Sequence, residues 1–200
     1  MPASPAETWI DLLRHGEPVG GSRYRGQRDD ALSEKGWEQM WRAIGPDQQW
    51  QQIVTSPLLR CRAFASELGE HLGVPVYPEP RFREIGFGEW EGKTRNELER
   101  QIPGQVVRFY QDPVRNRPSG AEPLDEFRVR VQAGFTDMVE RCAGQSVLVI
   151  AHAGVIRAIL AEVLGMPAAA MYRIHVANAA RSRICSDGVN GFRLIAHGIT

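Results

Sequence analysis

The sequence has no net charge, few cysteines and no long apolar run. Lysine plus arginine and aspartate plus glutamate both number 24 in 200 residues, which argues against a general attraction to nucleic acid. Cys61, Cys142 and Cys185 are scattered and not spaced as metal ligands, which favours reduced thiols in the cytoplasm. The longest apolar stretch, 151–172, is interrupted by charged residues, glycine and proline and is too broken to span a bilayer. We therefore expect a soluble cytoplasmic protein that binds neither nucleic acid nor membrane.

Lysine is almost missing from the sequence. Lys35 and Lys93 are the only lysines among the 24 basic residues, so 22 of these residues are arginines. The planar guanidinium group can grip a phosphate with two parallel hydrogen bonds, which a lysine ammonium group cannot do. A local anion site is therefore compatible with the zero net charge.

Apolar segments and breaker residues alternate in a way that predicts alternating strands and helices. The predicted strands are 9–13, 53–55, 74–77, 147–151, 173–176 and 192–196. The predicted helices are 34–44, 57–72, 96–101, 106–111, 124–141 and 154–164. In the second of these, we expect Ser56 to be the N-cap and Pro57 the first helical residue. This order predicts an α/β fold, a single three-layer α/β/α domain with a mainly parallel sheet and helices on both faces.

The length of the chain suits one domain, which we place at 9–200. Residues 1–8 are polar, contain two prolines and lack the basic start and apolar stretch of a secretory signal. We expect them to form a loose tail.

Two histidines stand at the ends of predicted strands. Arg14-His15-Gly16-Glu17 follows one apolar run, and His152-Ala153-Gly154 follows another. Open α/β sheets bind their ligands at the carboxyl ends of the parallel strands. Two histidines at that edge with arginines beside them indicate a phosphate site.

Further motifs accompany these two. They are Gly26-Gln27-Arg28-Asp29, Leu32-Ser33-Glu34-Lys35-Gly36, Ser56-Pro57-Leu58-Leu59-Arg60, Glu84-Ile85-Gly86-Phe87-Gly88-Glu89-Trp90-Glu91-Gly92, Gly120-Ala121-Glu122 and Ala151-His152-Ala153-Gly154-Val155-Ile156-Arg157. A lone Arg-His pair is a weak motif, but the whole ordered set resembles the histidine phosphatase superfamily, also called phosphoglycerate-mutase-like. The resemblance implies the same fold and a phosphomonoesterase of the histidine acid phosphatase type.

His15 and Glu84 match the reacting groups of that family. A neutral imidazole can attack phosphorus, so His15 could form a phosphohistidine if its other ring nitrogen donates its proton to a backbone carbonyl. Glu84 matches the position that protonates the departing alkoxide and later activates water.

The phosphoryl oxygens need fixed positive groups around them. Arg14, Arg60 and His152 match the positions that supply this clamp. The amide of Ala153, at a predicted helix start, adds a donor and the positive end of a helix dipole. We therefore expect no metal and no cofactor.

Three further residues are candidates for substrate binding, together with Ala153. Arg25 and Gly26 lie in the charged loop after the first strand, although Arg25 stands where the family usually has threonine or glutamine. Glu122 either contacts the substrate or only favours the amino end of its helix. Phe64 replaces a common threonine, and both departures affect substrate contacts more than the reacting groups. His71, His175 and His197 are interpreted as ordinary structural or surface histidines.

The segment after Glu84, Ile85-Gly86-Phe87, lacks the Arg-His-Tyr element of the mutases, so we favour a phosphatase that acts on a small-molecule phosphate monoester. The motifs at 84–92 and 120–122 resemble most the α-ribazole phosphatase branch, which removes a 5′-phosphate during assembly of the nucleotide loop of cobalamin. The alternatives are a broad sugar-phosphate phosphatase, a phosphoglycerate mutase, and a noncatalytic module that binds a phosphorylated ligand. The chain could act as a monomer or as a homodimer.

Overall fold

The computed structural model describes residues 6–45, 49–188 and 190–200, which form a mixed six-stranded sheet. Its strands are β1 (Thr8–Arg14), β2 (Gln52–Thr55), β3 (Val76–Pro78), β4 (Ser146–Ala151), β5 (Arg181–Ser186) and β6 (Phe192–Ile199), in the order β3-β2-β4-β1-β5-β6. The first four strands pair in parallel. β5 and β6 add an antiparallel edge. The predicted mainly parallel sheet is therefore confirmed.

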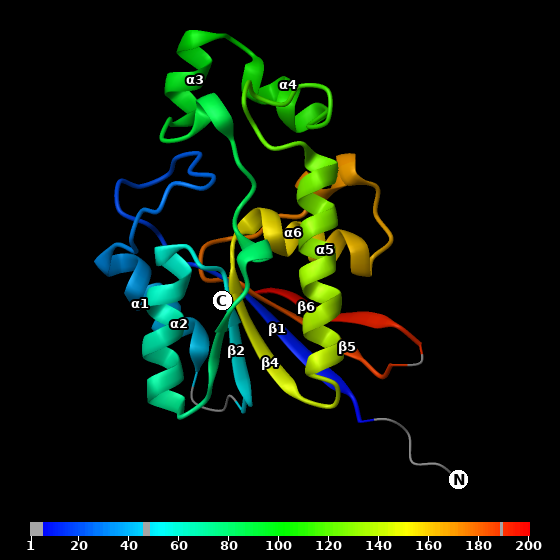
Figure 1. Cartoon of the computed structure of the whole chain (residues 1–200). Coiled ribbons are helices and arrows are strands. Elements are labelled where there is room, and N and C mark those ends of the chain that lie inside the picture. The colour runs from blue at the N-terminus through cyan, green and yellow to red at the C-terminus, as the bar shows by residue number, and fades with distance from the viewer. Residues whose placement is uncertain (1–5, 46–48, 189) are drawn as a thin grey trace.

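Helices cover both faces of this sheet (Figure 1). They are α1 (Glu34–Ile44), α2 (Leu59–Leu72), α3 (Arg95–Gln101), α4 (Gln105–Gln111), α5 (Leu124–Arg141) and α6 (Ala153–Val163), with short 3₁₀ helices η1 (Pro80–Phe82), η2 (Gly88–Trp90) and η3 (Ala168–Arg173). Side chains alternate between the faces of a strand. Leu12 packs with the residues of α5 and α6, and its neighbour Leu13 packs with those of α1 and α2. The three-layer arrangement is therefore confirmed.

Local signals set the bounds of several helices. Ser33 caps α1, because its hydroxyl accepts a hydrogen bond from the Gly36 amide. α1 and α5 span the predicted residues, and α6 begins one residue earlier than predicted.

Two predicted elements are wrong. The predicted strand at 173–176 is the end of η3 followed by irregular chain, and the fifth strand lies instead at Arg181–Ser186. The helix predicted from Pro57 begins at Leu59, and Leu58 takes the N-cap position predicted for Ser56. The Ser56 hydroxyl instead accepts a hydrogen bond from the Leu58 amide ahead of the helix.

Part of the predicted tail, residues 1–5, lies outside the described residues, and Thr8 already belongs to β1. Within the described parts of the chain, no helix is long and apolar enough to cross a membrane.

α3 and α4 stand beyond the end of the sheet at which β1 and β4 finish (Figure 1). Their core is separate from the two faces of the sheet and consists of Trp90, Leu98, Val106 and Phe109, with Tyr24, Phe87 and Tyr172 packed against it. The segment therefore encloses the edge where the sequence predicts a phosphate site.

Candidate active site

The two predicted histidines lie side by side. β1 and β4 are parallel neighbours with Arg14 in register with Ala151, so the residues that follow the two strands emerge together. The His15 amide donates to the Ala151 carbonyl at 3.0 Å. The rings of His15 and His152 meet edge to face with their centroids 5.2 Å apart. The sheet topology thus creates the pair that the sequence predicts.

The ring of His15 is held in one tautomer. Its Nδ1 lies 2.7 Å from the Gly16 carbonyl oxygen, and a carbonyl can only accept, so Nδ1 donates and Nε2 keeps its lone pair. Burial, followed by the positive charges of Arg14 and Arg60, lowers the pKa of His15 well below its ordinary value. His15 is therefore a neutral imidazole at pH 7.

Arg14 and Arg60 place two cations beside this ring. Arg60, in the first turn of α2, is fully buried, and its guanidinium donates to the carbonyls of Arg28 at 2.6 Å and Gly26 at 2.8 Å. Arg14 donates to the Val176 carbonyl at 2.7 Å. Burial lowers the pKa of Arg14 to about 10, which still leaves it charged at pH 7. The Nε atoms of both side chains are buried without a hydrogen-bond partner among the described residues.

Glu84 is fixed by two backbone amides. One carboxyl oxygen accepts from the Ile85 amide at 2.9 Å and the other accepts from the Gly154 amide, in the first turn of α6, at 3.1 Å. A β-carbon on Gly154 would lie 2.2 Å from a Glu84 oxygen, so only glycine allows this approach. Each oxygen keeps a second lone pair that can face a ligand.

His152 is the N-cap residue of α6 and is fully buried. Its Nε2 lies 2.7 Å from the Ser56 hydroxyl. Burial and the charge of Arg60 lower its pKa well below the ordinary value. Its ring contacts the His15 ring edge to face, and it is not among the residues that line the cavity described next.

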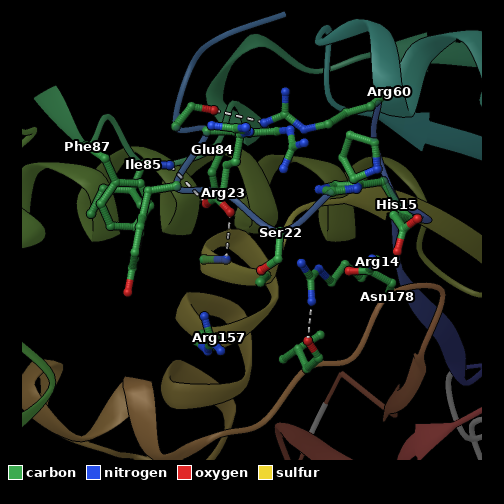
Figure 2. A pocket seen from close by; sticks show the side chains of 18 of the residues that line it. Arg14, His15, Ser22, Arg23, Arg60, Glu84, Ile85, Phe87, Arg157 and Asn178 are labelled. Atoms are coloured by element: carbon green, nitrogen blue, oxygen red, sulfur yellow. Dashed lines mark hydrogen bonds between the residues drawn. The ribbon is translucent and has the colours of Figure 1, made fainter. Parts of the chain in front are cut away.

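A cavity of about 460 Å³, which we call the His15 pocket, opens at this point. Figure 2 shows Arg14, His15, Arg60 and Glu84 around it. Its arginines are Arg14, Arg23, Arg25, Arg60, Arg95 and Arg157, and its acidic residues are Glu17 and Glu84. Its aromatic residues are Tyr24, Phe87, Tyr110 and Tyr172. The pocket is thus strongly positive with a partly aromatic lining, and its volume suits a small-molecule ester.

The predicted substrate-binding residues divide into two groups. Arg25, Gly26 and Ala153 line the His15 pocket, although Arg25 donates to Asp30 and to the carbonyls of Val19 and Gly21 and so braces its own loop.

Glu122 lies outside the pocket. Its carboxylate pairs with Arg130 at 2.7 Å and accepts from the Gly86 amide. It therefore supports the loop that carries Glu84. Phe64 is also remote, since it packs in the core between α1 and α2 against Trp37 and Trp41.

The sequence reasoning missed several pocket residues. Arg157 lies four positions after Ala153 on α6, and that spacing places both on one helix face, so its place beside the site could have been predicted. His175 and Asn178 also line the pocket. His175 comes from irregular chain that was expected to be a strand, and Asn178 follows that segment. Arg95 and Tyr110 come from the separate α3 and α4 segment.

Among residues 6–45, 49–188 and 190–200, no group of three or more histidine, cysteine, aspartate or glutamate side chains is placed to hold a metal ion.

Comparison with known sequences gives one family. The family model described as histidine phosphatase superfamily (branch 1) matches residues 10–199. A glucosyl-3-phosphoglycerate phosphatase of Mycolicibacterium vanbaalenii is 35% identical over 170 residues, which cover 78% of this chain and 74% of that protein. The chain spans about half the length, 53%, of three mycobacterial relatives to which it is 30% identical over 195 residues.

Solved structures give the same picture. The structure of mycobacterial glucosyl-3-phosphoglycerate phosphatase matches with a TM-score of 0.85 at 27% identity, over 97% of this chain and 100% of that one. The α-ribazole phosphatase from Shigella flexneri matches with a TM-score of 0.81 over 95% of this chain and 96% of that one. Its identity is 24%, so this likeness shows a shared fold alone.

Proposed function

Because the chain belongs to the histidine phosphatase superfamily, branch 1, we propose that it hydrolyses phosphate monoesters through a phosphohistidine formed on His15. The observation that carries the proposal is the His15 ring, whose Nδ1 donates to the Gly16 carbonyl. The lone pair on Nε2 remains available for attack on phosphorus, and the low pKa of the buried ring keeps it unprotonated.

In the first step, Nε2 of His15 attacks phosphorus, an N–P bond forms, and the P–O bond to the alcohol breaks. Arg14, Arg60 and the Ala153 amide at the start of α6 stabilise the phosphoryl oxygens. Fixed guanidinium groups perform this task in our proposal, so no metal ion takes part. Glu84, entering in its protonated form, gives its proton to the departing alkoxide.

In the second step, water attacks the phosphohistidine while Glu84 takes a proton from that water. The N–P bond breaks, phosphate leaves, and His15 returns to its neutral form. His152, whose Nε2 is engaged by Ser56, positions the His15 ring through their edge-to-face contact. This role differs from the direct phosphate contact that the family resemblance implies.

Two substrates compete within this reaction class. The 35% identity to a glucosyl-3-phosphoglycerate phosphatase supports a phosphorylated sugar derivative. The motifs at 84–92 and 120–122 support α-ribazole 5′-phosphate. The aromatic residues of the His15 pocket would contact a ring in either compound. Transfer of phosphate to another hydroxyl, rather than its release, would identify a mutase.

The test is phosphate release from a panel that contains glucosyl-3-phosphoglycerate, α-ribazole 5′-phosphate, simple sugar phosphates and p-nitrophenyl phosphate, with and without a chelator. We expect turnover that the chelator leaves unchanged and an acid-labile phosphoryl group on His15 in quenched samples. His15→Ala should lower kcat at least roughly a thousandfold and keep the wild-type circular dichroism spectrum, whereas His71→Ala, an exposed site on α2, should retain activity.

Turnover by His15→Ala at the wild-type rate would refute the phosphohistidine. If the wild type binds phosphate esters but releases no phosphate from any of them, the chain is a noncatalytic binding module.

A further inference from the structure

The proposed phosphoryl transfer gives no role to Arg157, one of the arginines that line the His15 pocket. Arg157 extends from α6, and its Nε donates to the Ile174 carbonyl at 2.8 Å. Its guanidinium carbon lies 5.4 Å from the centroid of the Tyr172 ring. Within the described part of the chain, no carboxylate lies within 4.0 Å of the Arg157 guanidinium nitrogens. Its positive charge therefore lacks a protein counterion.

Arg23 and Arg25, which also line the pocket, are already engaged, and Arg95 at the start of α3 is an exposed side chain. Arg23 donates to the carbonyls of Gly20 and Gly92 and lies 3.5 Å from Glu97. Arg25 pairs with Asp30 at 3.1 Å. These two hold the loop that they belong to, whereas Arg157 is half-buried and lines the cavity.

One short segment orients both Arg157 and Arg14. The Ile174 carbonyl accepts from Arg157, and the Val176 carbonyl accepts from Arg14. These two carbonyls are two residues apart, so the chain separates them by at most roughly 7 Å. Figure 2 shows Arg157 on the side of the pocket away from Arg60. The pocket therefore has a second positive position close to the predicted phosphoryl site.

We propose that Arg157 binds a carboxylate on the alcohol part of the substrate while the phosphoryl group lies against His15, Arg14 and Arg60. This inference rests on the proposed phosphatase function. It assigns the substrate to the phosphate monoesters of hydroxy acids, in which the carboxylate lies a few bonds from the phosphate. The Tyr172 ring contacts the Arg157 guanidinium. Tyr172 also lines the pocket, and its hydroxyl is buried without a partner among the described residues.

The proposal discriminates between the two substrates considered above. An ester of a neutral alcohol, such as α-ribazole 5′-phosphate, would cover Arg157 without pairing it, and an unpaired charge in a closed site is unfavourable. A sugar-acid phosphate supplies the missing anion.

The experiment measures binding rather than turnover, so it does not depend on catalysis. The probes are 3-phosphoglycerate and glycerol 3-phosphate, three-carbon esters that differ in the carboxylate. Their Kd values are measured by calorimetry on the His15→Ala protein, alone and combined with Arg157→Gln, Arg157→Lys or Arg42→Gln. Arg42 is exposed on α1 and provides the same chemical change outside the pocket.

We expect His15→Ala to bind the carboxylated ester about tenfold more tightly or better, because hydrogen bonds between charged groups are the strong ones. Arg157→Gln should bring the two Kd values together, Arg157→Lys should restore part of the difference, and Arg42→Gln should preserve all of it. Equal affinities in His15→Ala, or a preference that survives Arg157→Gln, would overturn the inference. If the protein with Arg157→Gln does not fold, the inference is still tested by the ratio of the two Kd values in His15→Ala and by the same ratio in the protein with Arg157→Lys. A wild type that shows the preference but releases no phosphate would refute the proposed function and leave this inference standing.

Discussion

Acid should destabilise this fold through His15 and His152 at a pH where most carboxylates are still ionised. Both rings are buried, with 6% and 0% of their surface exposed, and burial is the first cause of their lowered pKa values. In the unfolded chain a histidine titrates near its ordinary pKa of about 6.5. Below that pH the unfolded chain binds protons that the native protein does not bind. Stability is therefore full above pH 6.5 and falls as the pH falls toward the lowered native pKa values.

The size of the effect follows from the proton difference. Each extra proton bound by the unfolded chain changes the unfolding free energy by about 1.4 kcal/mol per pH unit. Between pH 6 and pH 5 an unfolded histidine is mostly protonated, so each buried ring that stays neutral over this range contributes roughly 1 kcal/mol. His15 and His152 together should lower the unfolding free energy by roughly 2 kcal/mol over this one unit.

Urea denaturation at pH 5, pH 6 and pH 7 tests this with three variants. His15→Gln and His152→Gln should each lose about half of the wild-type change, while His71→Gln, altered at an exposed position on α2, should keep all of it. The carboxylates contribute equally to the pH dependence of the unfolding free energy in all four proteins, so their contribution cancels in the comparison. The reasoning is refuted if His15→Gln and His152→Gln show the same pH dependence as the wild type.

Two further predictions concern Glu84 and Asp11. Glu84→Gln removes the proposed proton donor and should lower kcat for alkyl phosphates roughly 100-fold. The loss of kcat should be much smaller for p-nitrophenyl phosphate, because its leaving group departs without protonation. An equal loss for both substrates would exclude the donor role. Asp11 is 2% exposed and accepts from Trp50 at 2.8 Å and twice from Arg183. In urea denaturation, Asp11→Ala should therefore lower the unfolding free energy by about 2 kcal/mol, a figure that allows for the partial exposure of Arg183. As a control, Asp137→Ala removes an exposed ion pair and should lower the unfolding free energy by well under 1 kcal/mol.

The sequence predicted the elements whose signals are local. The apolar runs of β1 and β4 are buried from both sides, so they read as strands without any alternation. Ser33 provides a local start for α1, and Thr94 with Glu97 forms a capping box that begins α3. Because His15 and His152 directly follow β1 and β4, correct strand ends were enough to bring the two rings together.

The sequence did not predict β5, because this strand is stabilised by contacts with β1, which is far away in the sequence. The strand contains Arg181, Ser182 and Arg183, which give little apolar signal, and Arg183 pairs with Asp11 on β1. The segment at 173–176 has the apolar pattern of a strand, but its Ile174 and Val176 carbonyls accept hydrogen bonds from Arg157 and Arg14. A sequence pattern does not show which backbone carbonyls will face an arginine, and the strand prediction at 173–176 failed for this reason.

The charged groups around His15 are positioned by the backbone. Arg14 and Arg60 repel each other, and neither has a carboxylate within 4.0 Å in the described part of the chain. Arg60 is fully buried and Arg14 is half-buried. Their charges are instead shared by the backbone carbonyls of Gly26, Arg28 and Val176. These carbonyls hold the guanidinium groups in place without neutralising them, so in the proposed reaction a phosphate dianion would meet donors that need no reorganisation. Binding of that anion would relieve the repulsion between Arg14 and Arg60.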